Sequence, residues 1–193
     1  MTKVTAIIFD CFGVLVSESW LSFKQEFFGH DSNLAQEATN LLRQADAGLL
    51  SHDDFVAKVA GMANMSTKEV TNYLDRNLPN AELFDYIKQL KPKYKIGLLS
   101  NAAADWLQEL FSKEQLALFD AKTLSFESGM TKPAEGAYAS IAERLGVASE
   151  ACVFIDDQER HCTGAREAGM QAIWYQDFAQ MKRELEKLLL TSA

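Results

Sequence analysis

Long apolar runs are absent from this sequence of 193 residues, and proline and cysteine are scarce, at three residues each. No apolar stretch approaches the roughly 18 residues of a transmembrane helix, so we expect no membrane span. So few prolines leave little room for a long disordered linker. The cysteines are odd in number and lack metal-ligand spacing, which predicts reduced thiols in a cytoplasmic protein. The opening MTKVTAIIFD predicts a buried strand rather than a secretion signal.

Basic residues are also in the minority, with 19 against 27 acidic residues and a net charge of −8. This balance disfavours nucleic acid and anionic membranes as partners. It is compatible with a small anionic substrate, because a local lysine and a metal ion can outweigh the overall charge. The hydrophobic fraction of 48% and the length fit one domain with a modest insertion. Both a monomer and a homodimer are compatible with the sequence.

Short apolar runs separated by helical patterns dominate the rest of the chain. Runs typical of buried parallel strands occupy residues 6–9, 96–99, 152–155 and 172–175, with a weaker one near 119–124. Helical patterns occupy residues 82–90, 103–111, 134–145, 159–168 and about 178–190, and Gly146 and Gly169 stand where two of them would end. This alternation predicts an α/β fold with a doubly wound, Rossmann-like parallel sheet of five strands.

The segment 17–79 interrupts this alternation, because it contains no strand-like run. It predicts several amphipathic helices, two of which would begin at Ser51 with Asp54 and at Ser66 with Glu69. Inserted directly after the first strand, such helices would lie over the carboxyl end of the sheet.

We therefore expect a core domain of residues 1–16 and 80–193 and a small helical cap domain of residues 17–79. Aromatic residues with near-helical spacing would form the core of this cap: Trp20, Phe23, Phe27 and Phe28. Trp20 could also reach a substrate.

Polar side chains follow three of the expected strands, namely Asp10, the pair Ser100-Asn101 and the pair Asp156-Asp157. Ligands of open α/β sheets bind outside the carboxyl ends of the strands. Each of these residues alone would be ordinary at a strand end or a helix cap. The recurrence at three strands predicts a functional site at this edge.

Four motifs contain these residues and occur in a fixed order. They are Phe9-Asp10-Cys11-Phe12-Gly13-Val14-Leu15, Leu98-Leu99-Ser100-Asn101, Ser128-Gly129-Met130-Thr131-Lys132-Pro133, and Phe154-Ile155-Asp156-Asp157 followed by Gly164-Ala165 and Gly169. Over the whole chain this pattern resembles the haloacid dehalogenase-like (HAD-like) hydrolase superfamily, whose members are mostly magnesium-dependent phosphatases. It is most similar to the branch of small-capped sugar-phosphate phosphatases and the phosphatase domain of soluble epoxide hydrolases.

The resemblance implies a role for each motif. Asp10 would be the covalent nucleophile, Ser100 would hold the transferring phosphoryl group, and Lys132 would neutralise charge and orient the nucleophile. Substrate would be bound by Asn101, Phe12 and Trp20.

The resemblance also implies a bound Mg²⁺, which prefers oxygen ligands and takes one or two carboxylates. Asp10, the backbone carbonyl of Phe12 and Asp157 would bind the ion. Asp156 would lie beside it or share that role.

Phe12 departs from the superfamily pattern, because phosphatases carry a second aspartate there that protonates the leaving alcohol. General acid–base help is worth about 10²–10⁴ in rate. Either another group supplies it, or the enzyme is slow, or the leaving group needs little help. Glu18, His30 and His52 lie in or near the insertion and are candidate substitutes, although exposed helical residues are the plainer interpretation.

The same departure favours two alternatives. The 2-haloacid dehalogenases carry an aromatic residue at the position of Phe12, and their aspartate attacks carbon without a metal. A catalytically weakened relative that binds a phosphorylated ligand is the third hypothesis. The pair Asp156-Asp157 argues for phosphoryl chemistry, because acids beside Asp10 are unfavourable without a compensating cation. We predict a magnesium-dependent phosphatase for a small phosphomonoester, by analogy a sugar phosphate.

Two neighbouring residues are expected to be structural. Cys11 should point away from the site in an extended chain and be buried. His161 falls at the start of a helix near the acidic pair, where a helix-start histidine is a plainer interpretation than a ligand.

Overall fold

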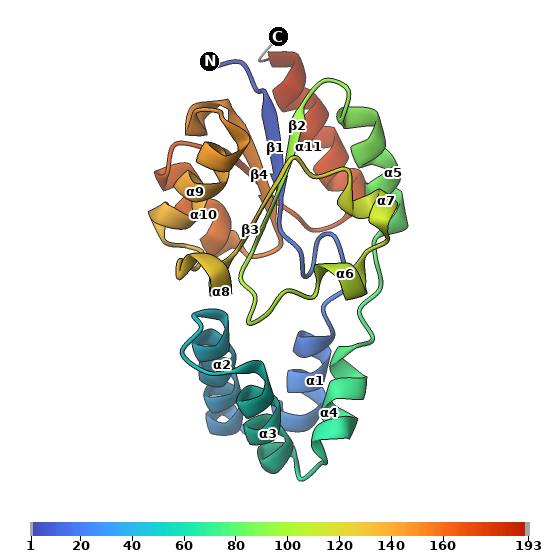
Figure 1. The fold of residues 1–193 in the computed structure, drawn as a ribbon, viewed down its shortest axis with the longest axis vertical. Coiled ribbons are helices and arrows are strands. Elements are labelled where there is room, and N and C mark those ends of the chain that lie inside the picture. The colour runs from blue at the N-terminus through green and yellow to red at the C-terminus, as the bar shows by residue number, and fades with distance from the viewer. Residues whose placement is uncertain (1, 192–193) are drawn as a thin grey trace.

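A parallel five-stranded sheet lies at the centre of the computed structural model, which describes residues 2–191 (Figure 1). The strands are β1 (Ala6–Phe9), β2 (Lys95–Ser100), β3 (Ala121–Leu124), β4 (Cys152–Asp156) and β5 (Gln171–Trp174). Their order is β3-β2-β1-β4-β5, so the chain builds outward from β1 in one direction and then in the other. The predicted doubly wound α/β sheet is therefore confirmed, including the weaker strand β3.

Both faces of β1 are buried, which explains why its sequence shows no alternation of apolar and polar residues. Ile7 and Phe9 belong to one hydrophobic cluster together with side chains of α5 (Ala81–Leu90) and α11 (Phe178–Thr191). Ala6 and Ile8 belong to the opposite cluster, which includes side chains of α9 (Glu135–Leu145) and α10 (Glu159–Glu167). Helices thus cover both sides of the sheet (Figure 1).

The remaining elements of the core are short. They are α6 (Leu107–Leu110), α7 (Lys113–Leu116), α8 (Ser125–Ser128) and the 3₁₀ turn η1 (Ser149–Ala151). Gly146 and Gly169 follow α9 and α10 with φ values of 63° and 86°, as predicted for helix ends. None of the helices described between residues 2 and 191 is long and apolar enough to cross a bilayer.

The helix predicted over residues 103–111 is wrong in extent, because only α6 is helical there. The backbone N–H of Ala102 donates to Ser125 Oγ at 2.9 Å, and the N–H of Leu107 donates to Asp105 Oδ1 at 3.0 Å. The bond of Leu107 occupies a donor that the predicted helix would direct to the carbonyl of residue 103, and the bond of Ala102 ties the residue before that helix to Ser125. The alanine-rich stretch therefore remains a loop despite its helical propensity.

The insertion forms a separate layer of four helices beyond the carboxyl end of the sheet (Figure 1). These are α1 (Ser19–Phe28), α2 (Ser32–Asp46), α3 (His52–Ala63) and α4 (Thr67–Leu74). The two predicted helix starts are confirmed, since Ser51 Oγ accepts from the N–H of Asp54, and Ser66 with Glu69 forms a capping box. The four helices bury a hydrophobic cluster of their own.

The two crossings between the insertion and the sheet are hydrogen-bonded to each other. The N–H of Ser17 donates to the carbonyl of Leu78 at 3.0 Å, and the N–H of Leu78 donates to Ser17 Oγ at 2.8 Å. A second tie joins the far end of α2 to the core, where Ser125 Oγ donates to the carbonyl of Asp46 at 2.5 Å. The insertion is thereby held over the end of the sheet at two places.

Phe23 organises the insertion, because its fully buried ring contacts Phe27 and Tyr73 at centroid distances of 4.6 and 5.2 Å. We expect Phe23→Ala to lower the free energy of unfolding by about 3–5 kcal/mol, since it removes these contacts and leaves a cavity. Denaturant unfolding followed by circular dichroism measures the change. Leu49→Ala, at a side chain that is 79% exposed, is the control and should change stability little. If both variants lowered the free energy of unfolding equally, the central position of Phe23 in the insertion would be contradicted.

Candidate active site

The register of the sheet brings acids from distant parts of the sequence together. Phe9 of β1 lies opposite Ile155 of β4, so Asp10 and Asp156, the residues that follow them, are neighbours. The backbone N–H of Asp10 donates to the carbonyl of Ile155 at 2.9 Å, which continues the pairing. Oxygens of Asp10, Asp156 and Asp157 lie within 4.8 Å of one another. The expected convergence of these three carboxylates is observed.

Lys132 is the buried cation of this cluster. Its Nζ lies 2.6 Å from Asp10 Oδ1 and 2.7 Å from Asp156 Oδ2. Burial opposes the charge of Lys132, but the two carboxylates outweigh it and raise the pKa of this amine above its ordinary value. The ammonium therefore stays charged between its partners.

Asn101 fixes the backbone that carries this lysine. Its Nδ2 donates to the carbonyl of Lys132 at 3.1 Å, and the N–H of Lys132 donates to Asn101 Oδ1 at 2.8 Å. The motif after β2 thus positions the motif before α9. Ser100, predicted to hold the phosphoryl group, is buried at the end of β2, and its hydroxyl donates to the carbonyl of Asn101 at 3.3 Å.

His161 plays a larger part than the sequence suggested. It lies in the first turn of α10 as expected, but it is buried and its Nδ1 lies 3.0 Å from Asp156 Oδ1. Burial works against the charge of Asp156, yet Lys132 and His161 together hold the pKa of this carboxyl well below its ordinary value. The sequence did contain a sign of this contact, because His161 follows Asp156 by only five residues. A helix that begins directly after a strand turns its first residues back toward the end of that strand.

Asp157 approaches the turn after β1 so closely that only glycine fits opposite it. A Cβ on Gly13, whose φ is +84°, would lie 2.5 Å from Asp157 Oδ2. On the other side, Trp174 Nε1 donates to the backbone carbonyl of Asp157 at 2.8 Å. Burial and the charge of Asp156 raise the pKa of Asp157 to about 6. Its buried Oδ1 has no hydrogen-bond partner among residues 2–191.

The donor set fits a divalent cation. Three carboxylates cluster here but Lys132 contacts only two of them, and burial raises the pKa of Asp10 well above its ordinary value despite this lysine. A buried carboxylate oxygen without a partner is strongly unfavourable, and a cation would satisfy that of Asp157. Asp156 already binds Lys132 and His161, which leaves Asp10 and Asp157 as the freer ligands. Oxygen ligands of this kind suit Mg²⁺.

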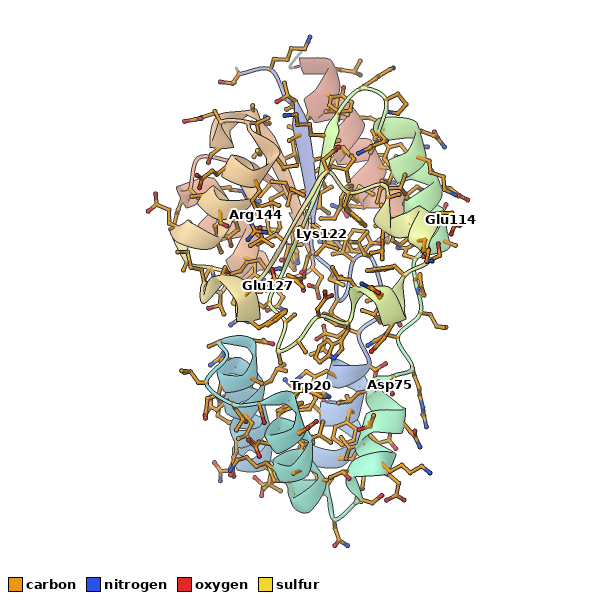
Figure 2. All side chains as sticks on the ribbon, in the orientation of Figure 1. Trp20, Asp75, Glu114, Lys122, Glu127 and Arg144 are labelled. Atoms are coloured by element: carbon orange, nitrogen blue, oxygen red, sulfur yellow. The ribbon has the colours of Figure 1, made fainter. Side chains whose placement is uncertain are left out.

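A cavity of about 510 Å³ opens between this cluster and the insertion. From the core it is lined by Asp10, Phe12, Asn101, Trp106, Lys132 and His161, and from the insertion side by Glu18, Trp20, Asp46, His52 and Phe55, among others. Trp20 and Asp75 lie at the core-facing end of the insertion (Figure 2). Trp20 is also packed on Phe23 and Phe55, so it belongs both to the core of the insertion and to the cavity wall.

Aromatic rings form a continuous part of this wall. Phe12 packs edge-on against Trp106 at 6.0 Å between centroids, and Trp106 contacts His52 at 4.9 Å. His30 is exposed, so it does not share this setting with His52. Cys11 is buried, as predicted, and its backbone N–H donates to Asp10 Oδ1 at 2.7 Å.

Comparison with known proteins agrees with this arrangement. The family model described as haloacid dehalogenase-like hydrolase matches residues 4–169. Among curated proteins, phosphatase MT3486 of Mycobacterium tuberculosis (strain CDC 1551 / Oshkosh) is 40% identical over 82 residues. That match covers 40% of this chain and 37% of the relative.

Solved structures share the fold. A HAD family enzyme from Bacteroides thetaiotaomicron in complex with magnesium and inorganic phosphate superimposes with a TM-score of 0.71, at 22% identity over 92% of this chain and 98% of that one. An L-2-haloacid dehalogenase from Xanthobacter autotrophicus with chloropropionic acid covalently bound gives 0.67, at 19% identity over 95% and 83%. The fold alone therefore does not separate the two chemistries.

Asp157→Asn tests the charge balance of the site. The raised pKa of Asp157 means that its ionised form costs stability above about pH 6, and that this cost is relieved as pH falls toward the ordinary value of about 3.9. In chelator we expect the variant to be about 1 kcal/mol more stable than the wild type at pH 8, a modest gain because the carboxyl is partly solvated. The advantage should vanish near pH 4.

Thermal unfolding with added Mg²⁺ completes the test. The ion should raise the melting temperature of the wild type and have little effect on Asp157→Asn, because a ligand stabilises the state that binds it. A variant that is less stable in chelator at every pH, or that responds to Mg²⁺ like the wild type, would contradict this reading of the site.

Proposed function

This chain belongs to the haloacid dehalogenase-like hydrolase family, and we propose that it is a magnesium-dependent phosphatase for small phosphomonoesters. The observation that carries the proposal is Asp157, whose buried Oδ1 has no partner beside two further carboxylates. Such a cluster suits a bound cation, and a cation suits an anionic phosphate substrate. The similar phosphatase supports the same reaction class.

Asp10 is the proposed nucleophile. Lys132 Nζ and the N–H of Cys11 both engage its Oδ1, which fixes the orientation of the carboxylate toward the cavity. Magnesium, held by Asp10, Asp157 and the backbone carbonyl of Phe12, would offset the repulsion between carboxylate and phosphate. Asp10 would then bond to phosphorus as the ester P–O bond breaks, and water would later release phosphate from the aspartyl phosphate.

Four further residues have supporting roles in this proposal. Lys132 neutralises charge and orients Asp10, and Asn101 keeps this lysine in place. Ser100 and the amide groups of the same loop would bind the transferring phosphoryl group. Asp156, engaged by Lys132 and His161, would lie beside a bound ion and hold the lysine that orients Asp10.

Substrate choice is assigned to the insertion. We propose that residues 17–79 act as a cap domain on a core of residues 1–16 and 80–193, and that the organic part of the substrate occupies the cavity between them. Phe12 and Trp20 would contact it there. The volume of about 510 Å³ suits a small molecule, by analogy a sugar phosphate.

Assays of purified protein with p-nitrophenyl phosphate and with 2-chloropropionate, with and without Mg²⁺, test the reaction. We expect phosphate release that depends on Mg²⁺ and stops in chelator. Asp10→Asn should lower kcat by about 10³-fold or more, because it removes the nucleophile.

The alternatives give different results. Chloride release that survives chelation would establish the dehalogenase reaction, which the aromatic Phe12 would suit. Inactivity on both substrates together with Mg²⁺-dependent binding of phosphorylated ligands would instead indicate a binding protein. Leu49→Ala is the control for Asp10→Asn and should keep wild-type activity, since this exposed side chain lies outside the site.

A further inference from the structure

The position after the nucleophile at which such phosphatases carry their proton donor holds Phe12 here, which lines the cavity and cannot transfer a proton. In phosphoryl transfer the attacking and leaving oxygens lie roughly in line across the phosphorus. With Asp10 attacking from the end of β1, the leaving oxygen faces the side of the cavity formed by the insertion. A proton donor for that oxygen must therefore come from the insertion or its connections.

We propose that Glu18 is the general acid that protonates the leaving oxygen, an inference that rests on the phosphatase function proposed above. Glu18 lines the same cavity as Asp10. Its Oε2 is buried and has no hydrogen-bond partner in the part of the chain that the structure describes. An unpartnered carboxyl oxygen in a reaction cavity is available to a substrate atom.

The local structure explains why this carboxyl is available. Glu18 occupies the N-cap position of α1, yet its side chain makes no capping hydrogen bond. The backbone on either side is fixed, since the N–H of Ser17 donates to the carbonyl of Leu78 and the N–H of Ser19 donates to Asn77 Oδ1 at 2.9 Å. The main chain at Glu18 is thus anchored while its carboxyl is left uncommitted.

The electrostatic surroundings keep this carboxyl protonated near neutral pH. Burial, followed by the charges of Asp157 and Asp46, raises the pKa of Glu18 to about 7. The charged groups that act on it are Asp156 at the end of β4, the next residue Asp157, Asp46 at the end of α2, and Lys24 on α1, which alone lowers the pKa. A general acid works best when its pKa lies near the working pH.

Two other groups of the cavity are weaker candidates. Burial also raises the pKa of Asp46 to about 7, but the positive charges of Lys132 and Arg160 oppose this shift. His52 Nδ1 is buried without a partner, but its ring is packed against Trp106 and Phe55. Within residues 2–191, neither group offers a buried carboxyl oxygen that lacks a hydrogen-bond partner, as Glu18 does.

The proton balance closes over the two half-reactions. As the bond from Asp10 to phosphorus forms and the ester P–O bond breaks, the Glu18 proton moves to the leaving oxygen, and a neutral alcohol departs. The Glu18 carboxylate then accepts a proton from the water that attacks phosphorus. Cleavage of the Asp10–phosphorus bond releases phosphate and restores both side chains.

The test compares leaving groups. Glu18→Gln should lower kcat/KM for an alkyl phosphate such as glycerol 3-phosphate by about 10²-fold or more, because an alkoxide needs a proton to leave. It should leave p-nitrophenyl phosphate nearly unaffected, because nitrophenolate leaves without one. Glu37→Gln, the same chemical change at an exposed residue of α2, is the matched control and should affect neither substrate.

A pH profile gives a second readout. For the alkyl phosphate, kcat/KM of the wild type should fall as pH rises through about 7, as Glu18 loses its proton, and Glu18→Gln should lack this limb. Glu18→Asp keeps a titrating carboxyl with a shorter reach, so it should retain the limb at a lower rate. It also replaces Glu18→Gln if thermal unfolding shows that the latter does not fold.

The outcomes separate this inference from the function on which it rests. Equal losses on both substrates in Glu18→Gln, or the leaving-group signature in Asp46→Asn or His52→Gln instead, would overturn the role of Glu18 alone. A wild-type protein without Mg²⁺-dependent hydrolysis of p-nitrophenyl phosphate would overturn the phosphatase and the general acid together.

Discussion

The contact of one buried ammonium with two carboxylates organises this protein. Lys132 Nζ lies within 2.7 Å of oxygens on both Asp10 and Asp156, in surroundings from which water is largely excluded. Removing one partner of such a buried group typically costs about 3–5 kcal/mol, so each member enforces the position of the others. The sheet register, the loop held by Asn101 and the ring of His161 all serve this contact.

The contact of Lys132 with Asp10 and Asp156 leaves the negative charge of Asp157 without a neutralising partner. Lys132 and His161 satisfy Asp156, but Asp157 keeps an unpartnered oxygen and a raised pKa. The carboxylate of Asp10 in this cluster also lines the cavity where an anionic substrate would bind. In our proposal a bound cation would offset both the local imbalance and the repulsion of an anionic substrate, so that metal binding and phosphate chemistry depend on each other.

The cavity joins two parts of different character. The core side presents charged groups fixed by strand ends, whereas the insertion side presents aromatic rings and the acids Glu18 and Asp46. Phe12 extends the aromatic wall onto the core through its contact with Trp106. Phe12, which stands in place of a proton donor, therefore also adds to the apolar surface of the cavity. In our proposal Glu18, on the opposite wall, supplies the proton instead.

Several features of the fold could be predicted because they depend on local sequence. Apolar runs that end in acids predicted the buried strands and their polar ends, and the serine–acid pairs predicted two helix starts. The helix predicted over residues 103–111 was wrong in extent, because the N–H of Leu107 donates to the side chain of Asp105 and the residue before the stretch is tied to Ser125. His161 was undervalued for a related reason, since its partner Asp156 becomes apparent only when the turn after β4 is built.

The sequence by itself determined the architecture and the identity of the acids, because periodicity and strand-end residues are written in adjacent positions. Only the tertiary structure decided which carboxylate is satisfied and which is left open, because that depends on the register of β1 against β4 and on the close approach of Gly13 to Asp157. It likewise decided that Glu18 faces the cavity without a partner. Burial and distance set the charge of such groups, and neither is encoded in spacing along the chain.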